Sequence, residues 1–217
     1  MIKRGRLKKH LKMTYQQRKL FNEIVERCVA NDVTLTLANS VRVVPPGEAA
    51  SGACSGVFDE ESELLAVAVG KPFLTWLPTL IHEYCHLCQY KDDVYTDDDE
   101  LHNQFWPWLE GKKKLSKAKV EASVKAIVGC ELDCERRVLN IIKRRDLGID
   151  PERYVQRANS YLFFYRAVAD KRQWYKKKAP HEVKAIIAMM PTKLFPLKIY
   201  LQTPNSKYLR LLEKKVF

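Results

Sequence analysis

The sequence predicts an α+β fold, in which a small N-terminal β-sheet precedes a mainly helical C-terminal half. Between residues 33 and 69, β-branched and other apolar residues form short alternating runs, a pattern typical of strands. From about residue 75 onward, apolar residues recur every three or four positions, which is the period of an amphipathic helix. Strands that come first and helices that follow are typical of an α+β domain.

One helix is expected ahead of the sheet. Residues 14–30 place Leu20 and Ile24 on one helical face, and Thr14 is a suitable N-cap. The strands are expected in two pairs, each joined by a short turn: 33–38 with 41–44, and 54–58 with 64–69. These strands form the small sheet, which Pro72 and the residues before it close.

Three long helices are expected after the sheet. The first contains residues 77–90 and ends in the acidic run 91–100, which we interpret as a surface loop. The second fits residues 116–146. The third begins at Pro151 with Asp150 as its N-cap and reaches about residue 173. Two shorter helical segments are expected near residues 181–190 and 205–215.

The composition is that of a globular intracellular protein. With 217 residues the chain suits one domain over residues 1–217. The first 13 residues of this range are expected to form a basic N-terminal extension. No apolar run approaches the ~20 residues needed to cross a bilayer, and the N-terminus lacks the apolar segment of a signal peptide. We therefore expect a cytoplasmic protein without membrane partners, whose six cysteines stay reduced.

The chain is strongly basic, with 38 Lys and Arg against 26 Asp and Glu and a net charge of +12. The excess gathers in four runs: 3–12, 111–119, 143–145 and 171–178. Such runs can follow a phosphate backbone, and Trp174 with Tyr175 could stack on a base. The runs are scattered, however, and no nucleic-acid motif accompanies them, which favours solvated, solubilising faces over a nucleic-acid partner.

Residues 77–90, "LPTLIHEYCHLCQY", contain a candidate metal-binding motif. His82 and His86 stand four positions apart on a helix, so both imidazoles can reach one ion at Zn–N distances of about 2.0–2.1 Å. Glu83 follows His82 and can reach a water on that ion. The H-E-x-x-H spacing thus supplies two zinc ligands and a general base on an otherwise uncharged stretch of helix.

The stretch "TLIHEYCHLC" resembles the active-site helix of the zincin metallopeptidases, which favour Val or Thr at the position that Thr79 occupies. The resemblance extends as a general layout over residues 54–138. It implies an edge strand, here 64–69, that holds an extended substrate beside the zinc. The chain also resembles small metallopeptidase-like proteins that bacteriophages encode, which implies the cytoplasm of a host cell.

A catalytic zinc site needs a third protein ligand and keeps its fourth position for water. Residues 128–138, "VGCELDCERRV", place Glu131 and Glu135 on one helical face. This helix resembles the E-x-x-x-D helix of zincins whose third ligand is glutamate. The resemblance implies that Glu131 binds zinc and that Glu135, in place of the usual Asp, accepts the free N–H of His82.

Other assignments remain open at this point. His102 follows His86 by sixteen residues and resembles the third histidine of SprT-like DNA–protein-crosslink proteases, although Asn103 departs from their usual glycine. Glu135 itself could be the ligand, or the site could have no third protein ligand. A four-thiolate zinc site is a further alternative, but its cysteines lie within continuous helices and suit core packing better: Cys85, Cys88, Cys130 and Cys134.

These observations predict a zinc-dependent metallopeptidase that hydrolyses peptide bonds, with Glu83 as general base and a protein or peptide as substrate. Two alternatives stand beside it. One is a SprT-like, DNA-associated protease with His102 as third ligand. The other is a zincin-fold protein without catalysis that binds nucleic acid or protein. Tyr154, Ala158, Tyr161 and Tyr165 form one helical stripe, which we interpret as core packing.

Overall fold

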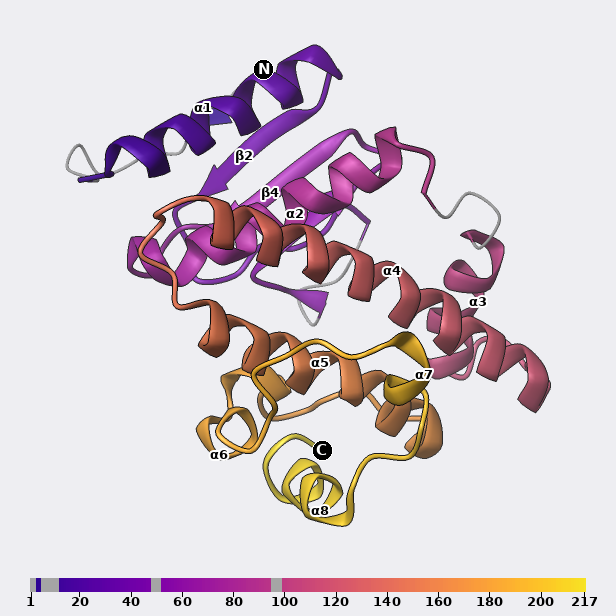
Figure 1. The fold of residues 1–217 in the computed structure, drawn as a ribbon. Helices are drawn as coiled ribbons and strands as arrows, with labels where there is room; N and C mark the ends of the chain where they lie inside the picture. The colour runs from indigo at the N-terminus through magenta and orange to yellow at the C-terminus, as the bar shows by residue number, and fades with distance from the viewer. Residues whose placement is uncertain (1–2, 5–11, 48–51, 95–98) are drawn as a thin grey trace. The chain divides into compact units, whose positions relative to one another are not determined.

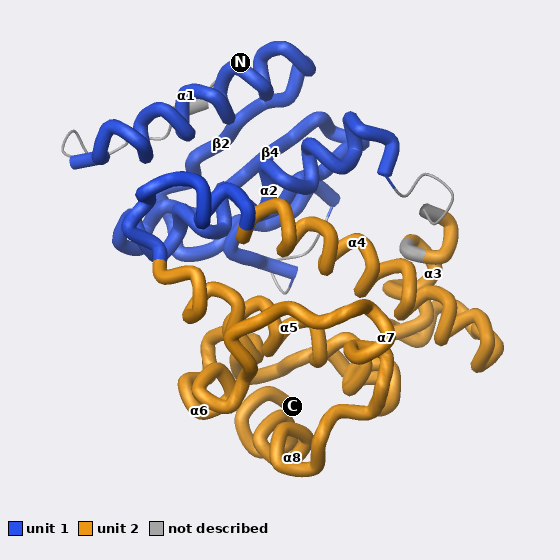
Figure 2. Tube along the Cα trace, viewed as in Figure 1, with its two compact units in different colours: residues 1–94, 140–149 blue, residues 95–139, 150–217 orange. Residues whose placement is uncertain are grey.

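The computed structural model describes residues 3–4, 12–47, 52–94 and 99–217 (Figure 1). The chain divides into two compact units, Met1–Val94 with Asn140–Ile149 and Tyr95–Leu139 with Asp150–Phe217 (Figure 2). Each unit is described by itself below. The predicted α+β class is confirmed. The single domain over residues 1–217 stays a prediction, and the basic extension over residues 1–13 falls mostly outside the described residues.

Unit 1 contains helix α1 (Tyr15–Ala30). The predicted cap is confirmed: the Thr14 hydroxyl accepts the Gln17 N–H, and the Gln17 side chain accepts the Thr14 N–H in return. Such a reciprocal pair satisfies two backbone donors that a helix start leaves open. The Gln17 amide also donates to the Leu147 carbonyl at 2.8 Å, which ties α1 to the last segment of the unit.

The sheet of unit 1 has the strand order β1-β2-β4-β3 among the described residues. Its strands are β1 (Lys3–Arg4), β2 (Thr34–Ala38), β3 (Gly56–Asp59) and β4 (Leu64–Ala68). β2 runs parallel to both β1 and β4, whereas β3 is antiparallel to β4, with Phe58 opposite Leu65. The predicted hairpin between residues 54–58 and 64–69 is therefore confirmed.

Two strand predictions are wrong. Residues 41–44 form no strand, and Val43 makes only an isolated bridge to Cys54. Pro45 and Pro46 follow directly and have no N–H to donate, so a regular ladder cannot continue there. Strand β4 is not an edge strand, because β2 and β3 flank it. The edge on this side of the sheet is β3.

Helix α2 (Phe73–Lys91) packs on β3 and β4 within unit 1. It begins right after Pro72 and carries Pro78 in its sixth position. The side chains of Leu77, Leu80 and Ile81 are fully buried, which explains why the helix persists through a residue that removes one of its hydrogen bonds. Helix α2 is the predicted helix that carries both histidines.

Unit 2 is helical and is built on α3 (Asp99–Leu109), α4 (Lys117–Arg144) and α5 (Pro151–Lys171). The α4 residues from 140 onward belong to unit 1. The predicted boundaries of α4 and α5 hold to within about two residues, and Asp150 caps α5 by accepting the Glu152 and Arg153 N–H groups. Shorter helices complete the unit: η3 (Pro180–Glu182), α6 (Lys184–Ile187), α7 (Leu197–Tyr200) and α8 (Ser206–Lys215).

Helix α3 contradicts the last part of the surface loop that we expected over residues 91–100. The helix begins at Asp99, so the acidic run ends earlier than predicted, and residues 95–98 of that run lie outside the described residues. Phe105 and Trp108 are buried on one face of α3, and their burial supplies the driving force for the helix. The acidic residues at the start of this helix were interpreted as a loop, so its short amphipathic pattern was not recognised in the sequence.

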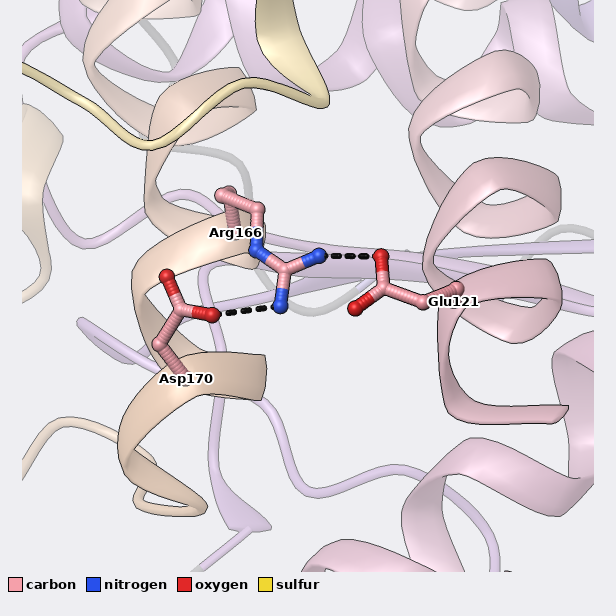
Figure 3. A network of polar contacts seen from close by, with 3 residues as sticks. All are labelled: Glu121, Arg166 and Asp170. Atoms are coloured by element: carbon pink, nitrogen blue, oxygen red, sulfur yellow. Dashed lines mark hydrogen bonds and ion pairs between the residues drawn. The ribbon is translucent and has the colours of Figure 1, made fainter. Parts of the chain in front are cut away.

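An aromatic and aliphatic core fills unit 2. Trp174 belongs to it, with its ring centroid 5.0 Å from that of Trp106. Its half-buried ring therefore packs against this core. Arg166 of α5 is 7% exposed and bridges Glu121 of α4 and Asp170, which ties the two helices together (Figure 3). Among the helices of the described residues, none is long and apolar enough to span a bilayer.

Candidate metal centre

The two histidines of the motif point their Nε2 atoms at one another. On α2, His82 Nε2 lies 3.1 Å from His86 Nε2, and the rings are nearly perpendicular at 83°. Two nitrogens that share a tetrahedral zinc at about 2.0–2.1 Å are themselves about 3.3 Å apart. The pair is therefore already spaced as two ligands of one ion. Both side chains are half-buried, so they are neither solvated freely nor sealed in a core.

Gln89 fixes the proton of His86, a partner that the sequence reasoning missed. Gln89 is 3% exposed, and its Oε1 lies 2.8 Å from His86 Nδ1. A carbonyl oxygen can only accept, so Nδ1 carries the proton and Nε2 keeps its lone pair for an ion. Its position three residues after His86, on the same helical face, was the available signal.

Glu83 is 8% exposed and is held against the edge strand. Its Oε2 accepts the Phe58 N–H at 3.0 Å. The Ala68 N–H donates to the Ser55 carbonyl, so these two residues form a hydrogen-bonded pair of the antiparallel ladder. Hydrogen-bonded and non-hydrogen-bonded pairs alternate along such a ladder, and Phe58, opposite Leu65, falls in a non-hydrogen-bonded pair. The Phe58 N–H therefore points away from β4. The carboxylate takes this outward donor, which sets the orientation of the predicted general base.

The approach of α2 to β3 depends on Gly56. A Cβ at Gly56 would lie 2.6 Å from Thr79 Cγ2 and 2.9 Å from Glu83 Cγ, closer than real contacts allow. Thr79, which the zincin resemblance singled out, thus packs against the edge strand, and Gly56 provides the room. A glycine in a strand often marks such a close approach, a signal that sequence reasoning could have used.

Cys54 lies beside the same carboxylate. Its thiol donates to the Gly56 carbonyl at 3.0 Å and is half-buried. Burial, with the nearby Glu83 carboxylate adding to it, raises the pKa of Cys54 to about 11. Burial raises the pKa of Cys28 to about 11 as well, and Cys88 adds to that shift. These thiols are therefore protonated at neutral pH and act as packing groups.

The acidic candidates lie on α4 in unit 2, and each accepts a hydrogen bond from a tyrosine of α5. Tyr165 Oη donates to Glu131 Oε1 at 3.2 Å, and Tyr154 Oη donates to Glu135 Oε2. Glu131 is half-buried and Glu135 is 8% exposed. The tyrosine stripe therefore has hydrogen-bonding roles that the packing interpretation did not foresee.

The remaining candidates divide between the two units. Cys85 and Cys88 lie on α2, and Cys130 and Cys134 lie on α4; none of these four cysteines forms a disulfide bond. Cys85 and Cys134 are buried, as packing residues should be, and the four-thiolate alternative stays a prediction. His102 lies within α3. The assignments of Glu131 to zinc and of Glu135 to His82 also stay predictions.

Comparison of the chain with protein-family models, with curated proteins and with solved structures finds no match in any of the three. The features that bear on function are therefore the local contacts of His82, Glu83 and His86.

Proposed function

We propose that the protein is a zinc-dependent peptidase of zincin type, with His82 and His86 as two of its ligands and Glu83 as general base. One observation carries the proposal: the two Nε2 atoms lie 3.1 Å apart, next to an oriented carboxylate on the same helix. At this distance one imidazole N–H can also donate to the other ring, so it is the carboxylate of Glu83 beside the pair that favours a metal site over a simple histidine pair.

The residues present suit zinc by their donor types. Imidazole nitrogens are ligands that zinc prefers, and Gln89 leaves the His86 Nε2 lone pair available. Zinc bound there would supply a Lewis acid that acidifies a water and polarises a carbonyl. Glu83 would take the proton from that water and deliver it to the leaving amine.

For the third ligand we propose Glu131, as the resemblance implies, and we add Cys134 as its competitor. Both lie on α4, where Glu131, Cys134 and Glu135 share one helical face. A thiolate is as good a zinc ligand as a carboxylate. We favour Glu131 because two imidazoles with a glutamate are a known catalytic set.

The experiment combines metal content with turnover. Purified protein, freed of loosely held metal, should contain one zinc per chain and should cleave a fluorescent casein substrate. Glu83→Gln should keep the zinc while hydrolysis falls about 10²–10⁴-fold, because the ligands remain and the base is lost. Glu61→Gln, an exposed acid in the turn before β4, serves as the matched control and should leave both unchanged.

Several results would overturn the proposal. Protein that takes up no zinc would exclude the metal centre altogether. Stoichiometric zinc without turnover of any protein substrate would favour the alternative of a zincin-fold binding protein. Full activity in Glu83→Gln would remove Glu83 from its role.

A further inference from the structure

The face of α2 that carries the candidate centre continues to an exposed aromatic side chain. Thr79, Glu83, His86 and Tyr90 follow one another at three or four positions, so they lie along one side of the helix. Tyr90 is 44% exposed, and among the exposed large apolar side chains of the described residues it is the one on this face of α2. A single exposed apolar side chain is ordinary by itself. The place of Tyr90, one turn beyond His86, is what distinguishes it.

Phe58 of β3 brings a second ring to Tyr90. The two ring centroids are 5.8 Å apart, and the rings are tilted by 49°. Gly56 and Phe58 lie on the same face of β3, because side chains alternate along a strand. At Gly56 this face meets Thr79 and Glu83 of α2. Phe58 thus contacts α2 twice: its N–H donates to Glu83 Oε2, and its half-buried ring packs beside Tyr90. One residue therefore joins the proposed base to an apolar surface.

The spacing along α2 suits a side chain of a bound peptide. Four residues of helix rise about 6 Å, so Tyr90 lies about that far along the axis from His86. An extended peptide rises about 3.3 Å per residue, so a side chain one or two residues from the centre reaches the same distance. Lys91 Nζ stands 5.0 Å from the centroid of the Tyr90 ring. An exposed cation is held only weakly at such a place, so a substrate ring can displace it.

We propose that Phe58 and Tyr90 form a subsite for an aromatic side chain of the peptide substrate, one or two residues from the bond that is cleaved. Two tilted rings offer a third ring both an edge and a face, which are the contacts that aromatic groups prefer. The inference rests on the proposed function and names the substrate class of that same centre: peptides with an aromatic residue near the scissile bond. It uses residues of unit 1 alone.

The experiment compares two capped peptides that differ only in a central Phe or Ala. Their dissociation constants are measured by fluorescence anisotropy in zinc-loaded Glu83→Gln protein, where hydrolysis is slow and the new side chain still offers the Phe58 N–H an acceptor. The Phe peptide should bind about tenfold more tightly, the scale expected for partly covering one aromatic side chain. With Tyr90→Ala added, this preference should fall to about twofold or less, because half of the subsite is lost.

Hydrolysis gives a second readout of the same preference. For protein that keeps Glu83, the ratio of kcat/KM between the two peptides should be about tenfold and should fall in Tyr90→Ala in the same way. Tyr90→Phe retains the ring and should retain the preference, which separates the ring from its hydroxyl. Urea denaturation checks that Tyr90→Ala is folded, as expected for a substitution at an exposed position.

Tyr15→Ala is the matched control. Tyr15 is a 77% exposed tyrosine at the first position of α1 in the same unit, so the substitution removes the same atoms from another exposed helix surface. It should keep the wild-type preference for the Phe peptide. A preference that fell equally in Tyr15→Ala and Tyr90→Ala would overturn the subsite, since the loss would then not depend on the place of the ring.

The outcomes separate this inference from the proposed function. Equal affinity for the two peptides, or a Phe preference that survives Tyr90→Ala, would overturn the subsite while zinc binding and hydrolysis stand. Protein that takes up no zinc or cleaves no peptide would refute the proposed function, and the inference would fall with it.

Discussion

His82 and His86 illustrate how much a single spacing can specify. Four positions on a helix put two side chains on one face, and the structure brings their Nε2 atoms to 3.1 Å. The ring orientations are set locally, by Gln89 for His86 and by the rotamers that the helix allows. The spacing of the two nitrogens is therefore set within one helix, α2.

Gln89 provides a test of that local control. Gln89→Leu should lower zinc affinity about 10–100-fold, because His86 loses the acceptor that keeps its proton on Nδ1. Gln89→Glu retains an acceptor at the same place and should restore most of the affinity. Isothermal titration with zinc measures both. Equal affinity in Gln89→Leu and wild type would mean that the His86 tautomer is set by something else.

The third ligand can be assigned by single substitutions on α4 and α3. Glu131→Ala should strongly weaken zinc binding and abolish hydrolysis, since the site loses a charged ligand. Glu135→Ala should be milder, at about 10–100-fold, and His102→Ala should change little. Zinc content, peptide hydrolysis and the free energy of unfolding are measured for each, because removing a buried acid can also disturb its helix.

The pattern of losses chooses among the alternatives. An essential His102 with a dispensable Glu131 would move the protein toward the SprT-like proteases and make DNA the first partner to test. If Cys134→Ala loses zinc while Glu131→Ala keeps it, the third ligand would be the Cys134 thiolate and not the Glu131 carboxylate. Equal losses from Glu131→Ala and Glu135→Ala would contradict the order in which we assign ligand and supporting acid.

Among the elements, β3 and α2 are the pair on which the candidate centre depends. The strand offers the outward Phe58 N–H, and Gly56 lets the helix come close enough for Glu83 to accept it. The zincin resemblance implies that the edge strand lies beside the active-site helix. β3 takes that place in the sheet, although residues 64–69 were predicted for it. The prediction named the wrong strand, and the role of an edge strand in holding substrate stays a prediction.

Gly56→Ala tests this close approach. The added methyl would press on Thr79 and Glu83, so we expect a loss of about 1–3 kcal/mol in the free energy of unfolding and a marked loss of hydrolysis. Gly56→Ser should cost at least as much. Ser55→Ala, at the preceding residue, is the control. Ser55 already has a Cβ, so this substitution adds no atom to the strand and should change stability little. Wild-type stability and activity in Gly56→Ala would show that the strand and helix can separate freely.

Local signals predicted the elements best. Thr14 with Gln17, and Asp150 with Pro151, are capping patterns that act over three or four residues, and both helix starts are confirmed. Predictions that needed pairing between distant residues did less well: Val43 bridges Cys54 instead of forming a strand, and β2 pairs with β4 in parallel. Helix α3 was missed because its driving force, the burial of Phe105 and Trp108, is tertiary.

The candidate centre follows the same rule. His82, Glu83 and His86 could be named from their spacing alone, since one helix supplies all three. The groups that orient Glu131 and Glu135 could not be named, because Tyr165 and Tyr154 come from another helix. A stripe of tyrosines reads as core packing until the partner of each hydroxyl is known.

For the whole molecule, the net charge of +12 is the property that bears most directly on partners. The basic runs at 112–114 and 176–178 consist of exposed lysines. The backbone N–H groups of Lys176 and Lys177 both donate to the Val216 carbonyl, which fixes that run beside the end of α8. The charge makes acidic partners more favourable than basic ones in general. It does not by itself define a binding face.

We expect no measurable binding to a fluorescent DNA duplex at about 50 mM salt, with the lysine runs acting as solubilising faces. Fluorescence anisotropy over a salt series measures this. Steep, log-linear binding would contradict the expectation. In that case, replacing Lys176, Lys177 and Lys178 with Gln should reduce the salt slope if that run contacts phosphates. Replacing Lys112, Lys113 and Lys114 removes the same charge and is the control.

The hydrogen bond from Phe58 to Glu83 makes one backbone amide a reporter on the proposed catalytic base. The partner of this N–H is a side-chain carboxylate, whereas its neighbours on the ladder are protected by backbone carbonyls. Its exchange with deuterated solvent is therefore governed by where the Glu83 carboxylate spends its time. A ligand that draws Glu83 away from the strand would speed exchange at Phe58 and leave Val57 and Asp59 as they were. Occupancy of the centre could thus be followed residue by residue, without a substrate and without any turnover.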